Sequence, residues 1–135
     1  MILDTGPLLA AIHVRDGDHA ACVQLLSQRR ERFVVPAPVV VELDWLVRTR
    51  LGSNAFDAIL ADVESGGLVV EELHPVDYSR IRDLCQQYDD LNLGFVDAAV
   101  VAVAERLHEP RIATLDHRHF SVIRPAAGGA FQLLP

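Results

Sequence analysis

Short apolar runs alternate along the chain with longer segments of helical spacing. The apolar runs are bounded by Pro, Gly or charged residues, which is typical of strands buried on both faces of a sheet. These runs predict strands at 1–4, 33–35, 68–73, 111–115 and 131–134. The segments between them repeat apolar residues at helical intervals and predict helices at 5–12, 16–30, 39–51, 54–63, 76–88 and 95–107.

Alternation of strands and helices predicts an α/β domain whose mostly parallel sheet is covered by helices on both faces. The 135 residues suit a single domain over 1–135, and no repeat, linker or low-complexity tract interrupts the pattern. Sheets of this kind carry their sites outside the carboxyl ends of the strands. Polar side chains that follow the predicted strands are therefore the first candidates for chemistry.

Composition indicates a packed protein of the reducing cytoplasm. Hydrophobic residues make up 50% of the chain, far more than a disordered segment carries. Cys22 and Cys85 both lie in helix-like segments and are expected to be reduced and buried. The start "MILDTG" lacks the basic residues of a secretion signal, and the longest apolar run, 98–104, is too short to cross a bilayer. We therefore expect a cytoplasmic protein with no membrane contact.

The charge balance excludes several classes of enzyme. The formal net charge is −7, and all 12 basic residues are Arg, with no Lys. A Walker-A nucleotide hydrolase and a Schiff-base enzyme both need a Lys, so neither is compatible with this chain. An acidic protein also lacks the broad basic surface by which many proteins grip nucleic acid. If the substrate is a nucleic acid, a metal ion is a natural source of the missing positive charge.

Four acids stand where an uncompensated charge would be costly. Asp4 ends the first predicted strand and Asp116 the strand in "RIATLD". Asp97 lies in the first turn of the Ala- and Val-rich helix at 95–107, and Glu42 interrupts the apolar "VVVELDWLV". Each alone has a structural interpretation: Asp4 as a helix cap, Asp97 as a complement to the helix dipole, and Asp116 as a turn residue. Glu42 is the hardest of the four to explain in this way.

Considered together, the four acids favour a site for hard divalent cations. Carboxylate oxygens without Cys ligands suit Mg²⁺ or Mn²⁺ better than zinc. One or two such ions can neutralise a scissile phosphate, activate a water and stabilise the leaving oxygen. Such a cluster is one means of phosphodiester hydrolysis.

Four motifs in this order resemble the PIN-domain ribonucleases, especially the toxins of bacterial VapBC toxin–antitoxin pairs. They are "DTGPLL", the Glu of "VVVEL", "DAAVVAVAE" at 97–105 and "TLDHRHF" at 114–120, and together they extend over nearly the whole chain. The resemblance implies a three-layer α/β/α sandwich and a metal-dependent endoribonuclease toxin that inhibits translation. It also implies that Asp4, Glu42, Asp97 and Asp116 are the catalytic and metal-binding acids for Mg²⁺, or alternatively Mn²⁺. Thr5 and Thr114 would position ligands or phosphate.

The chain departs from the family pattern at two positions. Many members carry Ser or Asn at the position of Gly6, and many carry another acid at the position of His119. The number of metal ions is therefore left open. His117 and His119 are candidates for contact with RNA or for an imidazole near the metal, with plain solvent exposure as the alternative.

Contacts with RNA and protein partners are less sharply indicated. Arg15, Arg48, Arg50 and Arg118 are candidates for phosphate contact, each with an ordinary surface role as the alternative. Trp45 could stack on a base, although a core or interface position is favoured. The segment "VVVELDWLV" is apolar on more faces than one sheet contact can bury, which predicts a homodimer. The resemblance adds a VapB-type antitoxin whose tail covers the site.

Other functions fit the sequence less well. A haloacid-dehalogenase-type phosphatase requires Asp-x-Asp, whereas Asp4 is followed by Thr5 and Gly6, and a response-regulator receiver requires a late Lys. The stronger alternative is a PIN-like module that binds RNA or protein without cutting it. Such modules tend to lose acids, and this chain retains all four.

Overall fold

A five-stranded parallel sheet forms the centre of the computed structural model, which describes residues 1–28 and 30–135. The strand order is β3-β2-β1-β4-β5, and each neighbouring pair is parallel. The strands are β1 (Ile2–Leu3), β2 (Phe33–Pro36), β3 (Leu68–Glu71), β4 (Arg111–Ala113) and β5 (Gln132–Leu134). The central strand β1 is fully buried, as its all-apolar sequence requires.

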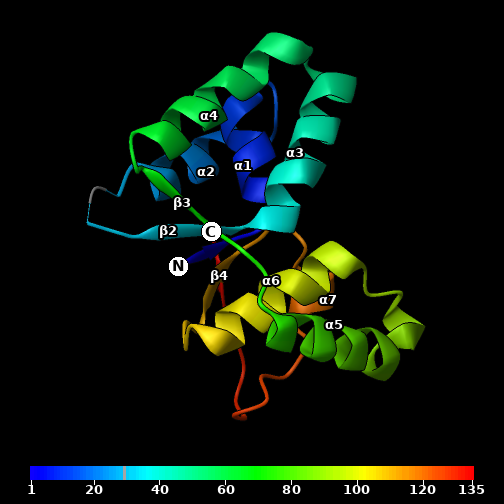
Figure 1. Ribbon diagram of the computed structural model, residues 1–135. Coiled ribbons are helices and arrows are strands. Elements are labelled where there is room, and N and C mark those ends of the chain that lie inside the picture. Colours follow the sequence, from blue (N-terminus) through cyan, green and yellow to red (C-terminus); the bar gives the residue numbers. More distant parts are fainter. Residues whose placement is uncertain (29) are drawn as a thin grey trace.

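Helices cover both faces of the sheet and complete the three-layer α/β/α sandwich (Figure 1). One layer holds α1 (Thr5–Ile12), α2 (His19–Leu26), α3 (Ala37–Arg50) and α4 (Asp57–Glu64), with the short helix η1 (Ser53–Phe56) before α4. The opposite layer holds α5 (Pro75–Gln87), α6 (Phe95–Arg106) and α7 (His117–Phe120), with η2 (Asp89–Leu91) between α5 and α6. The predicted fold class is thus confirmed.

The element predictions hold in outline and differ at the boundaries. The predicted helix 16–30 is shorter, because α2 ends at Leu26; residue 29 lies outside the described residues. The predicted strand 68–73 ends at Glu71, and 111–115 ends at Ala113. The four-residue helix α7 was not predicted, because "HRHF" is too short and too polar to show a helical apolar period. Of the two cysteines, both free, Cys22 is buried as expected, but Cys85 is only partly buried.

Ion pairs of Arg106 connect helices α5 and α6 to the edge strand β3. Asp77, at the start of α5, is only 2% exposed and accepts hydrogen bonds from Arg106 Nε at 3.0 Å. The same guanidinium binds Glu71 of β3 at 2.8 Å, so it joins α5, α6 and the sheet edge. Asp77 was not predicted from the sequence. The pattern that indicates its capping role is an acid two residues after Pro75 at the start of a helix. Its carboxylate accepts a hydrogen bond from the backbone N–H of His74 at 2.8 Å.

No helix among the described residues is both long enough and apolar enough to cross a membrane.

Candidate active site

The site lies where the direction of strand succession reverses. From β1 the chain moves through β2 to β3 on one side, and it then returns to β4 and β5 on the other. Asp4 follows β1, and Thr114 and Asp116 follow the adjacent strand β4, at the same edge of the sheet. This is the switch point at which α/β sheets hold their ligands, as the sequence predicted for the carboxyl ends of the strands.

Two threonines connect the acids by hydrogen bonds. Asp4 Oδ1 accepts from the backbone N–H of Thr5 at 2.7 Å and caps α1, while its Oδ2 accepts from Thr114 Oγ1 at 2.7 Å. Thr114 Oγ1 in turn accepts from the backbone N–H of Asp116 at 3.0 Å. Thr5 Oγ1 donates to Glu42 Oε2 of α3 in a short hydrogen bond. Thr5 and Thr114, both buried, therefore hold Asp4 in place and tie it to Glu42 and to the Asp116 backbone.

All four predicted acids line one open cavity of about 560 Å³. Asp4 comes from the end of β1, Glu42 from α3, Asp97 from the first turn of α6, and Asp116 from the start of α7. Arg50, His117 and Arg118 also line this cavity. Asp97 lies in the first turn of α6, as predicted, and its carboxylate accepts a hydrogen bond from the Gly94 backbone.

Burial raises the pKa of two of the acids, Asp4 and Asp97. Burial raises the pKa of Asp4 from 3.8 to about 6, and the charges of Asp97 and Glu42 add to that rise against the hydrogen bonds from Thr114 and Thr5. Burial also raises the pKa of Asp97, with Asp116 and Glu42 acting in the same direction. A cation placed among these carboxylates would reverse both shifts.

Elsewhere the chain neutralises its shielded acids with Arg. Glu105 pairs with Arg80 at 2.7 Å, Asp77 with Arg106 at 3.0 Å, and Glu109 with Arg111 at 2.7 Å. Within the described part of the chain, by contrast, Asp4, Glu42 and Asp97 form no ion pair with any Arg. These three carboxylates thus differ from the other shielded acids in that no described Arg neutralises them.

The donor set of this cavity fits a hard divalent cation. Its oxygen ligands are carboxylates and hydroxyls, the chemistry that Mg²⁺ and Mn²⁺ prefer, and Asp4 and Asp97 carry the raised pKa values that such an ion would relieve. Among the described residues, no three His, Cys, Asp or Glu groups already stand together in a metal-holding arrangement. Binding would therefore draw the carboxylates closer. The Asp116 side chain is 42% exposed and has the room to move.

Gly6 and Leu115 form a close contact at the edge of the cavity. A Cβ atom at Gly6 would lie 3.3 Å from Leu115 Cβ, closer than side chains normally approach. Both residues line the cavity, so Leu115 fills the space beside Gly6. This contact gives a steric reason for the absence of the Ser or Asn side chain expected from the resemblance.

The remaining candidates differ in their placement. Arg50 and Arg118 line the cavity, whereas Arg15 is exposed outside its lining, and Arg48 pairs with Asp44 at 2.8 Å. His117 lines the cavity and its Nε2 lies 3.1 Å from Thr114 O. His119 is not among the described lining residues; it lies against Asp116.

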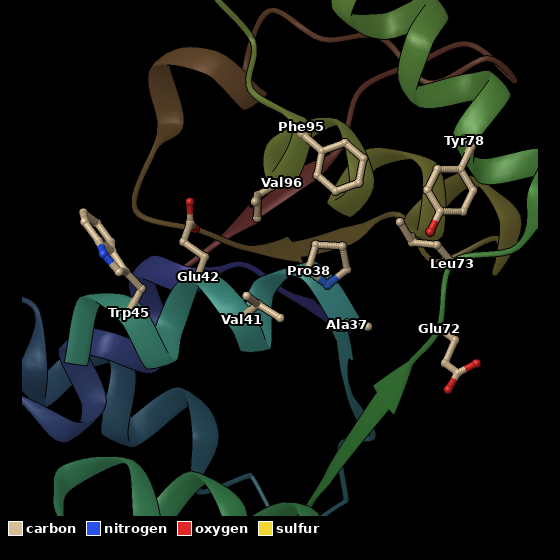
Figure 2. Close-up of a pocket in the computed structure, with 10 residues that line it drawn as sticks. All are labelled: Ala37, Pro38, Val41, Glu42, Trp45, Glu72, Leu73, Tyr78, Phe95 and Val96. Carbon is tan, nitrogen blue, oxygen red and sulfur yellow. The ribbon is translucent and has the colours of Figure 1, made fainter. Parts of the chain in front are cut away.

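Trp45 is 64% exposed and belongs to an apolar groove beside the acid cavity. The groove has a volume of about 760 Å³, and Glu42 lines both it and the cavity. Figure 2 shows Trp45 and Val41 on α3, with Phe95 and Tyr78 on the opposite wall. A core position for Trp45 is thus excluded.

Comparison with known proteins finds similarity along the whole chain. The PIN domain family matches residues 1–124. The chain is 37% identical over 135 residues to Ribonuclease VapC26 of Mycobacterium tuberculosis, with 100% of each chain covered. The crystal structure of Mycobacterium tuberculosis VapC20, a sarcin-ricin loop cleaving toxin, superposes with a TM-score of 0.76 at 22% identity, covering 82% of this chain and 85% of that one. The match to VapC20 shows a shared fold.

Proposed function

Because this chain belongs to the PIN-domain family and, within it, to the VapC ribonucleases, we propose that it is a metal-dependent endoribonuclease toxin of a type II toxin–antitoxin pair. Its reaction would be hydrolysis of RNA phosphodiester bonds, and its effect in the cytoplasm would be inhibition of translation. The observation that carries the proposal is the cluster of Asp4, Glu42 and Asp97, which lie in one cavity and form no ion pair with Arg among the described residues.

Asp4, Glu42, Asp97 and Asp116 would hold Mg²⁺ or Mn²⁺, which neutralises the scissile phosphodiester and activates the attacking water. Thr114 keeps the Asp4 carboxylate oriented, and Thr5 does the same for Glu42. Arg50, Arg118 and His117 line the cavity and would bind the phosphates on either side of the cleaved bond.

A metal titration with matched variants tests the nuclease assignment. Purified wild type should cleave RNA in Mg²⁺ or Mn²⁺ and stop when EDTA is added. Asp4→Asn and Asp97→Asn should abolish cleavage, whereas Asp62→Asn, which changes an exposed acid of α4, should cleave like wild type. Metal-independent cleavage, or full activity of both cavity variants, would refute the proposal. Transfer RNA and ribosomal RNA are the first substrates to examine.

We further propose that the groove beside the cavity is the homodimer interface. Val41 is 72% exposed and Trp45 64%, and Tyr78 and Phe95 on the opposite wall are about half exposed. Apolar side chains gathered in this way on two walls of one groove are typical of a surface covered by another subunit. Trp45→Arg should convert the dimer to a monomer in sedimentation experiments, and Leu60→Arg, on the exposed face of α4, should leave it dimeric. A wild-type monomer at micromolar concentration would contradict the interface.

The cognate VapB-type antitoxin would inhibit by placing a basic side chain among the unpaired acids. An Arg or Lys there would form charge-assisted hydrogen bonds and occupy the position of the metal ion. Replacing that antitoxin residue by Gln should weaken inhibition. If inhibition is unaffected, the antitoxin must act by covering the RNA-binding surface.

A further inference from the structure

We infer that His119 is a positioning residue, whose imidazole ring orients the Asp116 carboxylate for metal binding. The inference rests on the proposed function, because it assigns His119 a role at the metal site formed by the cavity acids. His119 would act through Asp116 and would not touch the ion or the RNA.

Both oxygens of the Asp116 carboxylate are contacted by the same residue. The backbone N–H of His119 donates to Asp116 Oδ1 at 3.1 Å and so caps α7. The ring Nδ1 of His119 lies 2.8 Å from Asp116 Oδ2. Because α7 is a single turn, these two contacts arise from one local geometry in which the ring folds back over the carboxylate.

The ring nitrogen Nδ1 of His119 is shielded from solvent, and Asp116 is the acid in contact with it. Nδ1 of His119 is buried, and no described residue meets it along the direction of an ideal hydrogen bond. Asp116 Oδ2, at 2.8 Å, is in electrostatic contact with it. A buried donor of this type is costly to leave unpaired, which favours the ring staying on Asp116.

His119 contacts Asp116 but does not itself line the cavity among the described residues. Asp116, His117 and Arg118 line the cavity, whereas His119 is not among its described lining residues. Each carboxylate oxygen offers two lone pairs, so Asp116 retains acceptor capacity on both oxygens after His119 has bound. The ring therefore restricts the rotation of Asp116 without occupying the positions that face the cavity. Partners of this kind typically change metal affinity or activity by 10- to 100-fold when they are removed.

Direct measurement of Mn²⁺ binding by the full, metal-stripped chain tests this role without relying on catalysis. Free Mn²⁺ would be quantified by electron paramagnetic resonance during titration of each variant. His119→Asn places an amide nitrogen where the ring has Nδ1, and His119→Gln places it near the Nε2 position; His119→Ala removes both. The backbone N–H to Asp116 Oδ1 remains in all three variants, so only the ring contact is altered.

We expect His119→Ala and His119→Gln to weaken Mn²⁺ binding by about 10- to 100-fold and His119→Asn to retain an affinity close to that of wild type. His13→Ala, which removes an imidazole outside the cavity lining, should leave Mn²⁺ affinity unchanged. Melting curves in EDTA establish whether each variant is folded. If His119→Ala does not fold, His119→Gln, which preserves the bulk of the side chain, takes its place in the comparison.

Three results would overturn the inference, and they are distinguishable. If wild type binds Mn²⁺ and His119→Gln binds it equally well, the positioning role is wrong while the proposed nuclease stands. If wild type itself binds no Mn²⁺, the metal-dependent function and the inference both fail. Loss of affinity in His119→Asn equal to that in His119→Gln would show that bulk or ring packing matters, and not the Nδ1 contact.

Discussion

The stability of the metal-free protein should fall as pH rises from about 4.5 to 7, because of Asp4. Its pKa is raised from 3.8 to about 6, chiefly by burial. The folded state therefore binds a proton on Asp4 over a pH range in which the unfolded chain has released it. Stability from this group is fully present below about pH 4 and is lost as pH rises through 6.

The size of the effect follows from the shift. A pKa difference of about 2 units corresponds to about 3 kcal/mol over the full range, of which about 2 kcal/mol falls between pH 4.5 and 7. Asp4 is only 6% exposed, so solvent screening reduces this value little. Burial raises the pKa of Asp97 as well, which acts in the same direction. With a urea m-value of roughly 1–3 kcal/mol/M for a small domain, the midpoint of unfolding should fall by about 1 M urea.

Glu109 titrates in a separate pH range. Hydrogen bonds from Arg111 lower its pKa from 4.5 to about 2. Its contribution is present above pH 4.5 and is lost as pH falls toward 2, the reverse of Asp4. Measurements restricted to pH 4.5–7 therefore report on the cavity acids with little contribution from Glu109.

Urea unfolding in EDTA at closely spaced pH values is the assay. Asp4→Asn should flatten the slope, and Asp62→Asn, which changes an exposed acid of α4, should retain the wild-type slope. The slope is the readout, because the Asn amide also alters the hydrogen bond from Thr114 and so changes absolute stability. Metal at about 100 times its dissociation constant should restore about 2.7 kcal/mol at pH 7. A wild-type midpoint that is constant or rises over this range would refute the electrostatic account.

Three further substitutions probe the site and its supports. Asp97→Asn should keep the fold, leave the metal-free melting temperature unchanged or higher, and flatten its response to Mn²⁺; lower melting with intact RNA cleavage would assign Asp97 a structural role. Asp77→Asn should cost roughly 3–5 kcal/mol in urea unfolding, because Arg106 would lose its buried partner. Gly6→Ser should cost about 1 kcal/mol or more by crowding Leu115, and Leu115→Ala in the same chain should recover part of that loss in a double-mutant cycle.

The sequence predicts the layers of this fold well because its strands are continuous apolar runs and its long helices repeat apolar residues. Positions after strands are equally readable, which is why Asp4 and Asp116 were found at the ends of β1 and β4. Glu42 was found by contrast with its apolar neighbours, and it does reach the cavity from α3. These features depend on local pattern, which a single sequence carries.

Features that depend on contacts between distant segments were missed. Nothing local indicates that Asp77 would be buried and paired with Arg106, 29 residues away. The stripe of "VVVELDWLV" divides into buried Val39, Leu43 and Val47 and exposed Val41 and Trp45, a division set by packing against the core. Periodicity also fails for a single helical turn, so neither α7 nor the contact of His119 with Asp116 was foreseen.

Because most of the paired acids of this fold are neutralised by its own Arg residues, RNA binding should depend on a divalent cation. Arg80, Arg106 and Arg111 hold the chain's own acids, so their positive charge does little to attract phosphate. The cavity acids, without such partners, would repel a phosphodiester until a cation reverses the local sign. Divalent salt usually weakens protein–nucleic acid binding by competing for phosphates. Here, at constant ionic strength, Mn²⁺ should tighten binding of RNA, measured by rapid mixing before cleavage begins, and Asp97→Asn should lose that gain. An affinity for this RNA that falls with Mn²⁺ in wild type and variant alike would mean that the acids do not face the phosphate.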